Sequence, residues 1–246
     1  MPYFNIVAET SENTVVTEYE PVKKRSDSYQ SEAALEQEFI RMLCEQGYEY
    51  LPIHTESDLV SNLRRQLEEL NHYTFSDTEW EDFFHNAIAN PNEHIVEKTR
   101  KIQEDHIQNL RRDDGSTKNI TLIDKKNIHN NRLQVINQYV VSTKDGAKHD
   151  NRYDVTVLVN GFPLVHIELK RRGVAIREAF NQIERYQRES FWSGSGLYEY
   201  IQIFVISNGA NTKYYSNSTR WNAEREHKKK GASKTKSSNS FEFTCF

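Results

Sequence analysis

Three segments in the first half of the chain carry apolar residues at the spacing of an amphipathic helix. In residues 31–46 the apolar positions recur three and four residues apart, and a glycine follows as a stop signal. Leucines repeat in the same way over residues 57–70. Ser76 and Glu79 have the spacing of a capping box, which predicts a helix through Ile88. Pro91 is expected to begin the next helix at its first position.

Short apolar runs with the character of strands dominate the remainder. Residues 5–10 and 13–19 read as edge strands, and from about residue 120 strand patterns replace helical ones. The later runs are broken by turn residues, and one helix is expected over about 174–189, after Gly173. The predicted strands of this second part cover residues 120–123, 133–136, a hairpin over about 151–169, 200–206 and 213–216.

The end of the chain has a different composition. Residues 216–240 are rich in Ser, Asn and Lys and nearly free of apolar side chains, so they are expected to form a flexible linker or loop. Residues 241–246 are apolar again and begin what reads as a new strand. We therefore expect one main domain over residues 1–215 and, after the linker, the start of a downstream region.

Composition limits the class of protein. The chain has 246 residues, of which 36% are hydrophobic and 28% charged, which allows a core in a water-soluble domain. No apolar run approaches the ~18 residues of a membrane span, and the N-terminus has no export signal. The two cysteines match no zinc spacing, so a reduced, cytoplasmic protein is expected. The net charge of -4 does not by itself indicate a nucleic-acid binder.

The predicted hairpin places charged residues on otherwise apolar strands. On its second arm His166, Glu168 and Lys170 share one face, because side chains alternate along a strand. A plain two-residue turn at Asn160-Gly161 would pair Asp154 with a residue of the opposite face. An odd-length loop or one bulge would bring Asp154 to the face of Glu168. We therefore predict a three-residue or bulged turn.

If the faces agree, the residue types suggest roles. Asp154 and Glu168 are hard oxygen ligands suited to Mg²⁺, with the backbone carbonyl of Leu169 as a third ligand. Lys170 lies close enough to orient a water or offset phosphate charge. The alternative interpretation is a solvated strand face with a surface ion pair. His166 is expected to face solvent or DNA rather than a metal.

The following helix and the flanking segments extend this pattern into a resemblance. Asp154, Glu168-x-Lys170 and then Gln182-x-x-x-Tyr186 resemble the PD-(D/E)xK nuclease fold in its RecB-like branch. The longer blocks at residues 152–156, 168–183 and 205–209 resemble the N-terminal nuclease domain of the restriction (motor) subunit of type I restriction-modification enzymes. The resemblance implies an α/β fold with a mixed central sheet flanked by helices, in which residues 1–215 form the endonuclease domain with N-terminal helical additions. It also implies that residues 241–246 are the start of a truncated downstream translocase region.

The resemblance also implies roles for individual residues. It makes Asp154, Glu168 and Lys170 the catalytic positions. A helical glutamate is expected near the metal, either Glu36, slightly favoured, or Glu32. The remaining expected site residues support the site or touch DNA, and they are Gln182, Tyr186, Arg171 and Arg172. Tyr153 departs from the family pattern, which has proline at that position.

Cofactors and partners follow from the same resemblance. Mg²⁺ and double-stranded DNA are expected at the site, and the specificity and methylation subunits are the expected partners. The family's motor uses ATP, but residues 231–235 lack the first glycine and preceding strand of a phosphate-binding loop. ATP is therefore expected to bind the full-length subunit outside this fragment. The alternatives are an independent RecB-like nuclease and a catalytically inactive DNA-binding or subunit-docking domain of the same fold.

Overall fold

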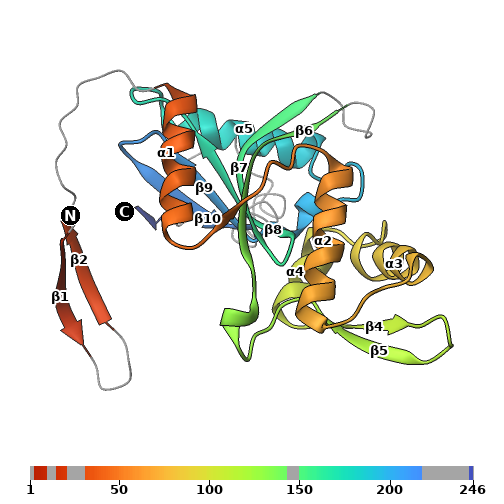
Figure 1. The fold of residues 1–246 in the computed structure, drawn as a ribbon. Coiled ribbons are helices and arrows are strands. Elements are labelled where there is room, and N and C mark those ends of the chain that lie inside the picture. Colours follow the sequence, from red (N-terminus) through yellow and green to blue (C-terminus); the bar gives the residue numbers. More distant parts are fainter. Residues whose placement is uncertain (1–2, 10–14, 21–30, 143–149, 218–243, 246) are drawn as a thin grey trace, which may run out of the picture.

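A seven-stranded mixed sheet forms the centre of the molecule (Figure 1). The computed structural model describes residues 3–9, 15–20, 31–142, 150–217 and 244–245. In the sheet, β8 runs parallel to β9 and β3 parallel to β6, whereas the other neighbours are antiparallel. In spatial order the strands are β11 (Thr244–Cys245), β10 (Thr212–Ser216), β9 (Ile203–Ser207), β8 (Phe162–Leu169), β7 (Asn151–Val159), β6 (Leu133–Val141) and β3 (Glu49–Tyr50).

Helices cover both faces of this sheet and divide the core in two. Helix α1 (Glu32–Glu45) packs its buried Ile40 against one face, where Val155 and Ile167 also point. Helix α5 (Ile176–Glu189) packs Ile183 on the other face, which belongs to the larger core cluster. That cluster also includes residues of α2 (Glu56–Asn71), α3 (Asp77–Phe83) with its π-helical extension Phe84–Ile88, α4 (Ile95–Gln103) and the 3₁₀ turn Leu197–Tyr200. The central strands β7 and β8 are therefore covered on both faces.

Two small antiparallel sheets accompany the main one. The first pairs β1 (Tyr3–Glu9) with β2 (Val15–Glu20). The second pairs β4 (Ile107–Arg111) with β5 (Thr117–Thr121). None of the helices among the described residues is long and apolar enough to cross a membrane.

Most elements expected from the sequence are present. The helices predicted over 31–46, 57–70 and 174–189 are confirmed as α1, α2 and α5. Both hydrogen bonds of the predicted Ser76–Glu79 capping box are formed. The strands expected at 5–10 and 13–19 are also confirmed, and they pair with each other.

The predicted helix start at Pro91 is wrong. Helix α4 begins at Ile95, and the Glu97 carboxylate accepts a hydrogen bond of 3.1 Å from the His94 backbone amide. Upstream, the side chain of Asn90 accepts a hydrogen bond from the Asn92 amide at 3.0 Å. This side-chain turn spans Pro91 and competes with a helical start there.

The structure describes only part of the C-terminal region, so it tests only some of the predictions made there. Residues 218–240 of the expected linker lie outside the described residues. Thr244 and Cys245 pair with β10, which agrees with a short strand in this region. The division into an endonuclease domain, a linker and the start of a downstream region remains a prediction.

The turn between β7 and β8 packs tightly against helix α2. Asn160 and Gly161 have φ angles of 50° and 83°, the left-handed pair that a two-residue hairpin turn requires. A Cβ atom added to Gly161 would lie 2.6 Å from the Cα atom of Leu63, so only glycine fits without backbone movement. The Asn160 side chain also binds the Leu122 carbonyl at 3.0 Å. Both turn residues are therefore fixed by their surroundings.

We predict that Gly161→Ala destabilises the domain more than Gly115→Ala. Gly115 has a similar φ of 80°, but no atom lies within 4 Å of its added Cβ, so it controls for backbone strain alone. The clash at Gly161 should add about 1–3 kcal/mol to the loss in free energy of unfolding. Urea denaturation of both variants measures the difference, and equal losses would contradict the close packing described here.

Candidate active site

A bulge in strand β8 brings the two predicted acids to the same face. Val159 pairs with Phe162 directly across the two-residue turn, but the register shifts by one residue between Val157 and Leu158. Leu164 is the extra residue, because Leu158 pairs with Pro163 and Val157 with Val165. Beyond the bulge Val155 pairs with Ile167, so the preceding residue Asp154 comes opposite Glu168. The turn itself has two residues, so the predicted three-residue or bulged turn is absent, but the one bulge that the face argument requires is confirmed in strand β8.

Asp154, Glu168 and Lys170 lie together at the end of this hairpin. Glu168 is fully buried, and the Lys170 Nζ atom is 2.9 Å from its Oε1 atom. Asp154 Oδ2 accepts a hydrogen bond of 2.9 Å from the Leu169 backbone amide. The charged residues are thus held by the strands themselves, in contrast to the alternative of a solvated strand face.

Burial and mutual repulsion dominate the electrostatics of the site. Loss of solvent, followed by the nearby Glu168 carboxylate, raises the pKa of Asp154 to about 7. Burial alone would lower the pKa of Lys170, but Glu168 and Asp154 raise it above its usual value, so Lys170 stays protonated. One ammonium group therefore faces two carboxyl groups. When both carboxyl groups are ionised, these three side chains carry a net negative charge.

Helix α1 brings both candidate glutamates towards this cluster. Glu36 is 7% exposed, and its charge contributes to the raised pKa of Asp154. Glu32 is exposed, and its Oε1 atom accepts a hydrogen bond of 3.1 Å from the Arg171 amide. Of the two, Glu36 is the buried one beside Asp154, which favours it as the helical acid of the site.

Sequence reasoning missed the residues that hold Glu36. Asn137 and Gln138 of β6 both donate side-chain hydrogen bonds to its carboxylate. Gln138 has a φ of 53° within the strand. A positive φ at a glutamine inside a strand leaves no signal in a hydrophobic pattern, so these two residues were not identifiable from the sequence.

Gln182 and Tyr186 support the hairpin from helix α5. Tyr186 is 1% exposed, and its hydroxyl donates a hydrogen bond of 2.9 Å to the Arg152 carbonyl. Gln182 donates to the same hydroxyl from one turn earlier. Burial, and next the charge of Glu168, raise the pKa of Tyr186. Of the two roles expected for this pair, the burial of Tyr186 favours supporting the site over touching DNA.

The expectation that His166 faces solvent or DNA is wrong. Its side chain is fully buried, with its ring centroid 5.6 Å from that of Tyr153 and 5.8 Å from that of Phe191. Strand β8 lies between two strands and beneath α5, which explains the burial. The His166 Nε2 atom is 3.4 Å from Glu168 Oε2 without a hydrogen bond between them.

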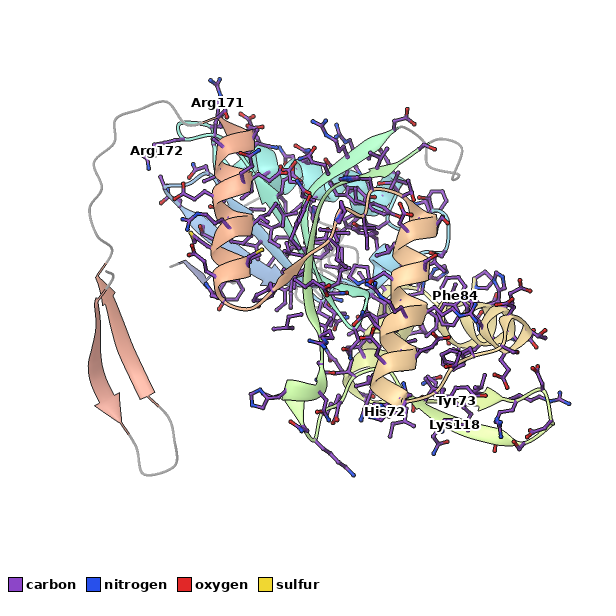
Figure 2. The ribbon with its side chains drawn as sticks, in the orientation of Figure 1. His72, Tyr73, Phe84, Lys118, Arg171 and Arg172 are labelled. Atoms are coloured by element: carbon purple, nitrogen blue, oxygen red, sulfur yellow. The ribbon has the colours of Figure 1, made fainter. Side chains whose placement is uncertain are left out.

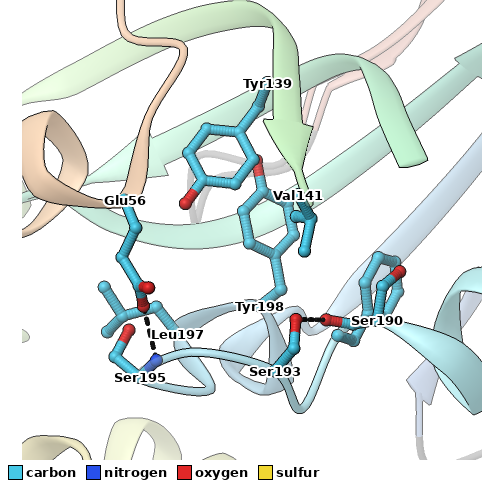
Figure 3. A pocket seen from close by; sticks show the side chains of 9 residues that line it. Glu56, Tyr139, Val141, Ser190, Ser193, Ser195, Leu197 and Tyr198 are labelled. Atoms are coloured by element: carbon cyan, nitrogen blue, oxygen red, sulfur yellow. Dashed lines mark hydrogen bonds between the residues drawn. The ribbon is translucent and has the colours of Figure 1, made fainter. Parts of the chain in front are cut away.

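An aromatic cluster forms the apolar wall behind the site. Tyr153, the departure from the family pattern, is fully buried and donates a hydrogen bond of 2.6 Å to Ser190. Its ring lies 4.6 Å from that of Tyr198. Figure 3 shows Tyr139 and Tyr198 side by side in a small pocket, which contains none of the predicted site residues. Tyr153 is therefore a core residue in this chain.

The two arginines lie on the outer side of the site. Arg171 and Arg172 are exposed and follow Lys170 directly at the end of β8. Figure 2 shows both beside the N-terminal end of helix α1, with their side chains directed away from the sheet. They supply positive charge at the mouth of the site and take no part in its buried cluster.

The buried Glu168 and the partly buried Asp154 fit a divalent cation, although the ligand set is incomplete. Within the described part of the chain, no group of three or more His, Cys, Asp or Glu side chains is placed to hold a metal ion. Mg²⁺ is, however, often held by one or two carboxylates, with waters and substrate phosphates completing its shell. Glu168 Oε2 is buried without a hydrogen-bond partner next to a second acid. Asp154 and Glu168 are therefore suited to a two-carboxylate metal site.

Comparison with known proteins decides the family. Residues 29–223 match the family described as type I restriction enzyme R protein N terminus, which is most of the chain. The chain belongs to this family. The predicted nuclease-like α/β fold, with helices on both faces of a mixed sheet, is confirmed for this type I restriction R protein N-terminal domain.

Individual relatives are named as endonuclease subunits of type I restriction enzymes. The EcoprrI endonuclease subunit of Escherichia coli is 48% identical over 215 residues, which cover 87% of this chain and 67% of that protein. The SauMSSORF170P endonuclease subunit of Staphylococcus aureus strain MSSA476 is 40% identical over 195 residues, 77% of this chain. The aligned part is 20% of the S. aureus protein, so the chain matches about a fifth of that relative.

A more distant relative aligns with a shorter part of the chain. The putative MjaIXP endonuclease subunit of Methanocaldococcus jannaschii is 33% identical over 107 residues. These cover 43% of this chain and 10% of that protein.

We predict that Asp154→Asn raises stability at neutral and higher pH. The folded pKa of about 7 exceeds the unfolded value near 4, so the wild type loses stability as pH rises from about 4 to about 7. Asparagine keeps an acceptor for the Leu169 amide but carries no charge. We expect a gain of about 1–3 kcal/mol in free energy of unfolding at pH 8 without divalent cations.

Chemical denaturation from pH 4 to pH 8 measures this gain. The exposed residue Asp82 provides the matched control, since Asp82→Asn should leave the pH dependence unchanged. A loss of stability in Asp154→Asn at pH 8 would contradict the proposed burial cost.

Proposed function

We propose that this domain is a Mg²⁺-dependent endonuclease that cleaves phosphodiester bonds of double-stranded DNA. The observation that carries the proposal is the convergence of Asp154, Glu168 and Lys170 at one end of a hairpin, made possible by the bulge at Leu164. This cluster combines the hard oxygen ligands and the single ammonium group that hydrolysis of a phosphodiester requires.

Each residue has a distinct task in this proposal. Asp154 and Glu168 hold the Mg²⁺ ion, with the Leu169 carbonyl as a third ligand and Glu36 as the nearest helical acid. An ion held by these residues would polarise the scissile phosphate and lower the pKa of a bound water molecule. Gln182 and Tyr186 fix the hairpin against α5, so that the two carboxylates stay on one side of the DNA backbone.

Lys170 acts as a hydrogen-bond donor. Its raised pKa keeps it protonated at neutral pH, so it cannot accept a proton from water. Its ammonium group instead orients the attacking water and offsets charge that develops on the phosphate. Arg171 and Arg172 lie next to it on the exposed rim, where they bind flanking phosphates.

The domain acts within a larger assembly in this proposal. The relatives are named as endonuclease subunits of type I restriction enzymes, and the chain matches about a fifth of most of them. We infer that the full subunit couples cleavage to ATP-driven DNA translocation, with ATP bound outside this chain. Specificity and methylation subunits supply recognition of the DNA sequence, and the complex works in the cytoplasm.

We predict that Glu168→Ala or Lys170→Ala lowers DNA cleavage by the complete restriction complex at least about 100-fold, with Mg²⁺ and ATP present. ATP hydrolysis should persist in both variants, because the proposed motor lies elsewhere. Lys118→Ala provides a matched control, since Lys118 lies on β5 at the far end of the molecule (Figure 2).

The outcomes separate the candidate functions. Cleavage that survives both site substitutions would exclude this nuclease site and favour a DNA-binding or subunit-docking domain. We expect the isolated 246-residue chain to cut weakly, because its net charge of -4 gives little overall electrostatic attraction to the DNA backbone. Strong Mg²⁺-dependent cleavage by the isolated chain would favour an independent nuclease.

A further inference from the structure

Gln138 adopts an unusual backbone conformation in the middle of strand β6. Among the described residues, three non-glycine residues have a positive φ, namely His72, Gln138 and Asn160. His72 ends helix α2 and Asn160 forms the hairpin turn, where this conformation is common. Gln138 alone lies inside a strand, flanked by paired residues on both sides. Such strain usually persists because the surroundings require it.

The left-handed residue breaks the alternation of side chains along β6. In a regular strand Ile136 and Tyr139 would point to opposite faces. In this strand both belong to the core cluster on the α5 side. Asn137 and Gln138, adjacent residues that should also diverge, both donate hydrogen bonds to the carboxylate of Glu36 on α1. The positive φ at Gln138 therefore turns two consecutive amides towards one acid.

This break lies opposite the candidate site. Asn137 pairs with Val155 and Tyr139 with Tyr153, so Gln138 is the residue across from Asp154. The interruption in β6 and the predicted metal ligand in β7 thus share one position in the sheet. A third contact fixes the orientation of the Asn137 side chain. The Tyr50 hydroxyl donates a hydrogen bond of 2.9 Å to Asn137 Oδ1, which leaves the Asn137 amide nitrogen directed at Glu36.

We propose that Asn137 and Gln138 are positioning residues that hold the Glu36 carboxylate beside the two-carboxylate metal site of Asp154 and Glu168, with Tyr50 orienting Asn137. This inference rests on the proposed nuclease function. Amide groups suit the task because they hold a carboxylate by hydrogen bonds and carry no charge of their own. A lysine or arginine in the same place would neutralise the carboxylate. The two amides thus keep the Glu36 carboxylate directed towards a cation bound by Asp154 and Glu168.

Gln138→Gly separates this positioning role from a structural one. Glycine accepts the positive φ without strain but lacks the amide, so thermal stability should stay equal or rise while Glu36 loses a hydrogen bond. We expect the affinity of the 246-residue chain for Mn²⁺, measured by electron paramagnetic resonance, to fall about 10-fold. His72→Gly is the matched control, because it relieves a similar φ of 48° far from the site and should not change Mn²⁺ affinity.

Two further variants test whether the effect passes through Glu36. In a Glu36→Gln background, Gln138→Gly should cause little additional loss of Mn²⁺ affinity, because the two residues act as one unit. Tyr50→Phe removes only a hydroxyl from a side chain that is 43% exposed. It should weaken Mn²⁺ binding less than Gln138→Gly without lowering thermal stability, and it provides the test if Gln138→Gly fails to fold.

The possible failures are distinguishable. Mn²⁺ affinity unchanged in both Gln138→Gly and Tyr50→Phe, while Glu168→Gln abolishes binding, would overturn the positioning role and leave the proposed function intact. An equal loss from Gln138→Gly with and without Glu36 would also overturn it. No Mn²⁺ binding by the wild type, or binding that survives Glu168→Gln, would overturn the metal site of the proposed function and this inference with it.

Discussion

The placement of two carboxyl groups side by side in an apolar sheet is the constraint on which this structure depends. Glu168 is fully buried and Asp154 partly buried, and the loss of solvent around Asp154 together with repulsion from Glu168 raises the pKa of Asp154 to about 7. One ammonium group, that of Lys170, is in contact with Glu168. Such an arrangement disfavours folding by itself, so the surrounding packing must hold it in place.

Both layers of helices contribute to holding it. On one side α5 fixes the hairpin through Tyr186, whose hydroxyl binds the β7 backbone. On the other, α1 contributes Glu36 and is tied to β6 through Asn137 and Gln138. The tight fit of Gly161 against α2 fixes the opposite end of the same hairpin. The site is therefore a property of the whole three-layer arrangement.

Much of this arrangement could be predicted from the sequence, because side chains alternate strictly between the two faces of a strand. Face parity alone required a bulge or an odd turn, and the structure has the bulge. Face parity could not locate the bulge at Leu164, because apolar residues lie on both sides of Leu164 and a bulge at several positions would satisfy the parity. Fully buried strands also hide their environment, which explains why His166 was expected at the surface although it lies in the core.

Other features escaped prediction because they depend on contacts between distant segments. Glu36 and Gln138 are 102 positions apart, and no local pattern links them. The turn over Pro91 depends on side-chain hydrogen bonds that compete with a helix start. Strand β4 was missed because polar residues interrupt its few apolar positions. These are the places where tertiary contacts override local propensity.

The central claim is that Asp154 and Glu168 together hold a divalent cation, and the most direct measurement is the position of such an ion. A crystal of the domain grown with Mn²⁺ would locate it by anomalous scattering. The account predicts one ion within about 2–2.5 Å of a carboxylate oxygen from each of these two residues, with Glu36 facing it. An ion bound at other acids, or a data set with no anomalous peak between Asp154 and Glu168, would contradict it.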